Sequence, residues 1–156
     1  MIVSVPHTGT RSLMKVLGES GNHHFCQNEG DFTKLHQHID FPVRDPLATS
    51  ISWRGYQCDR QDMDEFRRWE AAIDYLADYP YGVTYHVMEE YDIREGVGPG
   101  HWSRQALVDR DIESLKILPE VVFLLEWIQR PKIRNFFSQF YGRFWYAEDE
   151  RLQATG

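Results

Sequence analysis

This chain's fold follows from one stretch near its start, Val5-Pro6-His7-Thr8-Gly9-Thr10-Arg11-Ser12-Leu13. The stretch ends a short apolar run, Ile2–Val5, that is typical of a buried strand. It then opens a segment with helical spacing, Thr10–Glu19. Gly9 allows backbone angles that other residues avoid, so the turn between them can be tight. The stretch therefore predicts a strand, a loop and a helix in immediate succession.

The same stretch carries groups that bind anions. The first N–H groups of a helix have no partner inside the helix, and the helix dipole favours negative charge there. Side-chain hydroxyls and a guanidinium add further donors. We expect a phosphate group to be held by Thr8, Gly9, Thr10, Arg11 and Ser12. The loop is not a Walker A motif, because it has no lysine to contact the β- and γ-phosphates.

A second stretch repeats the pattern of strand, turn and helix. Ile39–Val43 is predicted to be a strand, Arg44 stands at its end, and Pro46 stands where a helix begins. Ser52 lies eight residues after Arg44, within the predicted helix. We expect Arg44 and Ser52 to bind the same phosphate group from two sides.

Strands alternate with helices over the first 90 residues, and further helices follow. Further strands are expected at His23–Gln27 and Val83–Glu89, and helices at Asp62–Tyr79, Glu113–Leu118, Pro119–Ile128 and Pro131–Tyr141. Val121–Leu125 taken alone also fits a strand, and Phe144–Tyr146 fits a short strand or a packed tail. The pattern predicts one domain over residues 1–156 with an α/β, three-layer fold, in which helices flank a short parallel sheet. Ligands in such folds bind at the carboxyl ends of the strands.

Composition limits the partners of the chain. The formal net charge is −7, which argues against broad binding to nucleic acid. No run of 18 apolar residues occurs, so we expect no membrane span, and the N-terminus does not resemble a signal peptide. Cys26 and Cys58 form no disulfide or metal pattern. We interpret them as reduced thiols, which predicts a cytoplasmic protein.

The two stretches together resemble the sulfotransferase superfamily. The first motif of that family is a strand followed by Pro-Lys-Ser-Gly-Thr-Thr, or by Lys-Gly-Gly-Thr-Arg-Ala-Leu in the heparan-type branch. Residues 6–13 are similar to both forms, and more so to the second. The second motif is a strand ending in Arg-(Asn/Asp)-Pro with a serine eight residues after the arginine. Arg44, Asp45, Pro46 and Ser52 match it.

The resemblance implies a P-loop NTPase-like sulfotransferase fold and a donor, 3′-phosphoadenosine 5′-phosphosulfate (PAPS), used without a metal. Residues 6–13 would hold the 5′-phosphosulfate, and Arg44 and Ser52 the 3′-phosphate. A sulfuryl group would pass to a hydroxyl or amine of a small-molecule acceptor. The lysine that the family uses at the leaving group is His7 here. His24 matches a family histidine and is the leading candidate for the acceptor base, with His23 in reserve.

Other interpretations of the sequence stay open. A P-loop-type kinase would bind magnesium-ATP, although the missing lysine argues against it. A catalytically inactive nucleotide-binding relative is a third interpretation, because the chain is short and His7 replaces the lysine. His36 and His38, with His23, His24 and Cys26, also suggest a zinc site, but their spacing matches no standard zinc pattern. The acceptor and the presence of a homo-oligomer are not determined by the sequence.

Overall fold

The computed structural model describes residues 1–18, 23–25, 36–54, 63–90 and 110–153. The chain divides into two compact units. One unit, which we call the sheet unit, consists of Met1–Asp45 and Asp62–Val97. The other, the helical unit, consists of Pro46–Gln61 and Gly98–Gly156.

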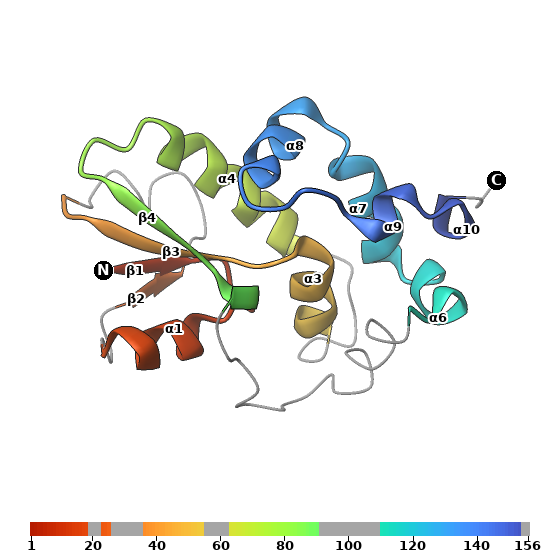
Figure 1. The fold of residues 1–156 in the computed structure, drawn as a ribbon, viewed down its shortest axis with the longest axis horizontal. Helices are drawn as coiled ribbons and strands as arrows, with labels where there is room; N and C mark the ends of the chain where they lie inside the picture. Colours follow the sequence, from red (N-terminus) through yellow and green to blue (C-terminus); the bar gives the residue numbers. More distant parts are fainter. Residues whose placement is uncertain (19–22, 26–35, 55–62, 91–109, 154–156) are drawn as a thin grey trace. The chain divides into compact units, whose positions relative to one another are not determined.

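The sheet unit is built on four parallel strands in the order β2-β1-β3-β4 (Figure 1). The strands are β1 (Ile2–Ser4), β2 (His23–Phe25), β3 (Ile39–Val43) and β4 (Val83–Val87). The prediction of a short parallel sheet is confirmed. β4 ends earlier than expected, because Met88–Glu90 turns into a short 3₁₀ helix, η1.

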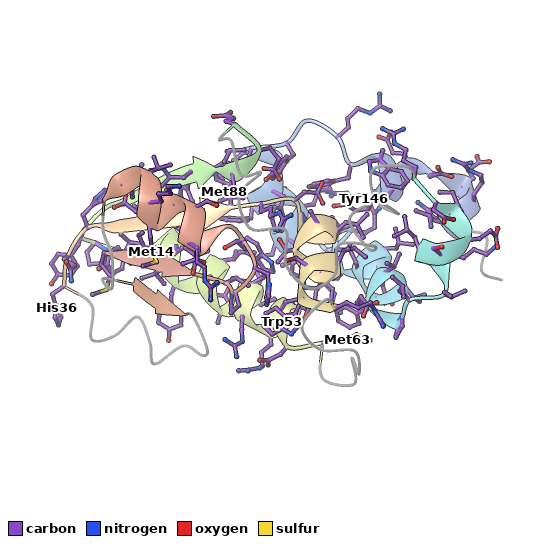
Figure 2. The ribbon with its side chains drawn as sticks, turned by 90° about the horizontal axis from the view of Figure 1, so that it is seen from below. Met14, His36, Trp53, Met63, Met88 and Tyr146 are labelled. Atoms are coloured by element: carbon purple, nitrogen blue, oxygen red, sulfur yellow. The ribbon has the colours of Figure 1, made fainter. Side chains whose placement is uncertain are left out.

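In the described part of this unit, a helix packs on each face of the sheet. On one face, Leu13 of α1 (Thr10–Leu17) packs with Ile2 and Met88 in a buried cluster. On the other, the ring of Phe41 in β3 meets Trp69 of α4 (Asp64–Ala77), with 5.9 Å between ring centroids. Figures 1 and 2 both show α1 and α4 on opposite sides of the strands. The expected helices flanking a parallel sheet are therefore present in this unit.

The first turn of α4 is held by an acidic residue at its positive end. Asp64 accepts hydrogen bonds from the guanidinium groups of Arg67 and Arg68. Burial acts to raise the pKa of Asp64, but these hydrogen bonds outweigh it and the pKa lies below its usual value. This stabilising contribution is present above the unfolded pKa of the carboxyl and is lost as the pH falls through the lowered one.

The helical unit contains α3 (Pro46–Arg54), α6 (Ile112–Lys116), α7 (Pro119–Trp127), α8 (Pro131–Ser138), α9 (Trp145–Glu148) and α10 (Glu150–Gln153). Val121–Leu125 is helical, so its interpretation as a strand is wrong. Phe144–Tyr146, expected as a short strand or a packed tail, is not a strand: it enters α9, where Tyr146 (labelled in Figure 2) is buried. Prolines start α7 and α8 because the first helical N–H needs no partner there.

A buried ion pair joins two helices of this unit. Arg54 of α3 donates from Nε and from a terminal nitrogen to the two carboxylate oxygens of Glu120 in α7, at 2.7 and 3.0 Å. The Glu120 side chain is fully buried, and the ion pair with Arg54 offsets the free-energy cost of burying its negative charge. Among the described residues, no helix has the length and apolar character needed to cross a membrane.

Candidate functional site

The site begins with the loop between β1 and α1, residues 5–9, which we call the β1–α1 loop. His7 and Gly9 both have left-handed backbone angles, with φ of +68° and +94°. Such angles are uncommon for residues other than glycine, although histidine adopts them more readily than most. Two left-handed residues flanking Thr8 turn the chain sharply at the carboxyl end of β1.

Hydroxyl groups inside the loop hold this shape. Thr8 is buried and its Oγ1 donates to the carbonyl oxygen of Val5 at 2.7 Å. The hydroxyls of Ser4 and Thr10 are hydrogen-bonded to each other, also at 2.7 Å. The side chains of Thr8 and Thr10, predicted as ligand donors, thus have partners within the loop and its strand. Sequence reasoning missed Ser4, which looked like an ordinary strand residue.

The start of α1 presents backbone N–H groups that have no partner within the helix. Gly9 is the N-cap and gives no side-chain cap, and no acidic residue lies in the first turn. The first hydrogen bond of the helix ladder runs from Leu13 N–H to Gly9 O at 3.0 Å. The N–H groups of the three residues before Leu13 therefore precede the ladder, as in helix N-termini that bind anions.

Arg44 connects the second motif to this loop. Its Nη1 donates to the carbonyl oxygen of His7 at 2.9 Å, and the residue is 9% exposed. The end of β3 and the β1–α1 loop therefore meet at the carboxyl edge of the sheet, as the sequence predicted.

The end of β4 completes the edge. Glu89 of η1 accepts a hydrogen bond from the backbone N–H of Asp45 through its Oε1, at 2.6 Å. The sequence predicted Glu89 only as the last residue of the strand Val83–Glu89. Glu89 instead positions the turn that carries Arg44. The position of Glu89 directly after β4 could have indicated this role in the sequence. Neighbouring parallel strands end at the same edge of a sheet, so Glu89 would be expected near the end of β3.

Arg11 and Ser12 lie beyond the loop on α1. Ser12 is half-buried in the first turn, and Arg11 is exposed. Arg11 lines a cavity of about 450 Å³ together with Met14, Lys15 and Gly18, at helical spacing along one side of α1. Two cations four residues apart give this side of the helix a positive character.

The remaining predicted residues lie on other elements than the β1–α1 loop. His23 and His24 lie in β2, whose backbone pairs with Ile2 and Val3 of β1, and their side chains lie outside the described residues. Their role as base stays a prediction. Ser52 lies in α3 of the helical unit, so its pairing with Arg44 also stays a prediction.

The histidines considered as zinc ligands lie elsewhere. His36 is hydrogen-bonded to the Tyr81 hydroxyl and His38 to that of Thr84. Both precede β3, at the edge of the sheet opposite the β1–α1 loop. Cys26 lies outside the described residues. Within the described part of the chain, no three histidine, cysteine or acidic side chains gather as metal ligands would.

Comparisons with known proteins gave no match, whether with protein-family models, curated proteins or solved structures.

Gly9→Ala tests how closely the loop fits. A Cβ at this position would lie 3.2 Å from Cε and 3.3 Å from Cγ of buried Met88, at a φ that strains any other residue. We expect a loss of about 1–3 kcal/mol in the free energy of unfolding, measured by urea denaturation. The matched control is Gly18→Ala, which has a φ of +68° and no neighbour within 4 Å of the new Cβ. An equal or larger loss in the control would show that contact with Met88 is unimportant.

Proposed function

We propose that the chain is a PAPS-dependent sulfotransferase whose donor site is the β1–α1 loop together with the first turn of α1. The observation that carries this proposal is the hydrogen bond from Arg44 to His7 O. It brings together the two stretches that resemble the phosphosulfate and 3′-phosphate motifs of one family. Within this proposal, the parallel sheet is that of a P-loop NTPase-like sulfotransferase fold.

The 5′-phosphosulfate would contact backbone N–H groups at the start of α1. Gly9 has no side chain to obstruct the approach, and the hydroxyls of Thr8 and Thr10 act indirectly by holding the loop. Exposed Arg11 and the hydroxyl of Ser12 supply further donors. Arg44 would bind the 3′-phosphate through its guanidinium, which lies at the carboxyl edge of the sheet.

Sulfuryl transfer needs three functions from the protein. An acceptor hydroxyl or amine attacks sulfur in line, the bond from sulfur to the bridging oxygen breaks, and adenosine 3′,5′-bisphosphate leaves. His7, if protonated, would stabilise the charge that develops on the bridging oxygen. His24, or His23 in its place, would accept the proton from the acceptor. No metal takes part in this proposal.

Calorimetric titration with adenosine 3′,5′-bisphosphate tests the donor site. We expect wild-type protein to bind it, and magnesium-ATP to bind far more weakly. Arg44→Ala should weaken binding by about 10- to 100-fold, since hydrogen bonds to charged groups contribute about 1.5–3 kcal/mol. Magnesium-ATP binding in preference to the bisphosphate would favour a kinase instead.

The matched control is Arg67→Ala, which removes an arginine of the same unit that is 58% exposed and pairs with Asp64 on α4. It should leave the affinity for the bisphosphate unchanged. Thermal melting of both variants separates loss of binding from loss of folding. Wild-type protein that is folded and yet does not bind the bisphosphate would overturn the proposed function.

His7→Lys tests the role at the leaving group. If His7 is a weak substitute for the family lysine, the variant should release adenosine 3′,5′-bisphosphate from PAPS about tenfold faster, with 2-naphthol as acceptor. His36→Lys, at the opposite edge of the sheet, is the control and should have no effect. An unchanged rate in a His7→Lys variant that still binds the bisphosphate would contradict this role. Binding without turnover in either protein would favour the inactive relative.

A further inference from the structure

The helical unit contains a cavity of about 320 Å³ between the end of α7, α8 and the segment that enters α9. This volume is near the lower end of the range for small-molecule sites. All its described lining residues belong to the helical unit, so the cavity is separate from the β1–α1 loop. Its lining combines an apolar wall with a few polar groups, as small-molecule sites commonly do.

The apolar wall is formed by Ile128, Phe144 and Ala147, with the ring of Tyr141 beside them. Ile128 is buried, and Phe144 is fixed by ring contacts with Phe137 and Tyr141 at centroid distances of 6.1 and 5.4 Å. A wall anchored in this way has a defined shape. It offers an apolar ligand a surface that is already formed.

The polar side of the cavity includes Arg134, Gln129 and Ser138. Ser138 already donates its hydroxyl proton to the carbonyl oxygen of Asn135, at 2.9 Å. Arg134 and Gln129, by contrast, have side chains that bond to no other described residue. A guanidinium and a carboxamide whose N–H donors bond to no other described residue therefore line the same cavity.

The charge of the lining selects the ligand. Arg143 and Glu148 also line the cavity, and they bond to each other through two contacts at 2.9 and 2.7 Å. Because this pair is neutral as a whole, the charge left over is the single positive charge of Arg134. One positive charge matches a ligand with one negative charge, and the flat fork of a guanidinium matches a carboxylate.

We propose that this cavity binds a small molecule that has one carboxylate on an apolar body. The carboxylate pairs with Arg134 and accepts a further hydrogen bond from Gln129. The apolar body lies against Ile128 and Phe144. This site is independent of the proposed donor site, and its test does not use PAPS or its bisphosphate product.

The test is titration of the whole chain with 3-phenylpropanoate, with its neutral amide and with acetate, followed by calorimetry. We expect the acid to bind at least about tenfold more tightly than the amide, which lacks the charge, and than acetate, which lacks the apolar body. Equal affinity for acid and amide, or no binding of the acid at millimolar concentration, would overturn the proposal.

Arg134→Gln should reduce affinity for the acid to that of the amide. Lys132→Gln is the matched control, since it removes a cation from the same helix at a position that does not line the cavity. It should leave binding unchanged. Full affinity for the acid in a folded Arg134→Gln protein would contradict the assignment of Arg134.

Gly142→Leu provides a second variant that leaves the charges intact. Gly142 lines the cavity, its φ is not left-handed, and a Cβ there would meet no heavy atom within 4 Å. The leucine should therefore be accepted by the fold and occupy open space at the cavity wall. We expect weaker binding of the acid with an unchanged melting temperature, and unchanged binding would contradict the location of the site.

Discussion

The hydrogen bond from Arg44 Nη1 to the carbonyl oxygen of His7 ties the loop after β1 to the end of β3. The loop contains His7 in a left-handed conformation, which costs free energy in a residue other than glycine, so a hydrogen bond to His7 supports the loop. The bond also keeps a positive charge beside the N-terminus of α1. One guanidinium, in a residue that is 9% exposed, thus both supports the loop and supplies charge to it.

Other contacts around the β1–α1 loop also hold it in place. Glu89 holds the backbone of Asp45, and the hydroxyls of Ser4, Thr8 and Thr10 hold the loop from within. Met88 lies next to Gly9, where a Cβ would come within 3.2 Å of its Cε. The carboxyl ends of β1, β3 and β4 are therefore linked by polar contacts at one edge of the sheet. Met88 also belongs to the core cluster that includes Ile2 and Leu13.

The sequence was sufficient for features that depend on local pattern. Apolar runs predicted the strands at 2–5 and 39–43, and turn residues predicted the helix starts at Thr10 and Pro46. The order of these elements also predicted that Arg44 lies near the loop. The role of Glu89 depends on β3 and β4 being neighbours, which no single segment encodes. Whether Thr8 and Thr10 donate to a ligand or to their own loop depends on distances within the turn, so residue type alone gave an incomplete account of them. The cavity near Arg134 involves separate helices, and no motif in the sequence marks it.

The most direct test of the central claim is the response of backbone amide resonances to adenosine 3′,5′-bisphosphate, measured by two-dimensional NMR on ¹⁵N-labelled protein. The account predicts that the largest shifts fall on His7 to Leu13 and on Arg44 and Asp45, while α8 in the helical unit is unaffected. Shifts confined to other segments, or no shift at the β1–α1 loop under saturating ligand, would contradict the claim that this loop and Arg44 form a phosphate site.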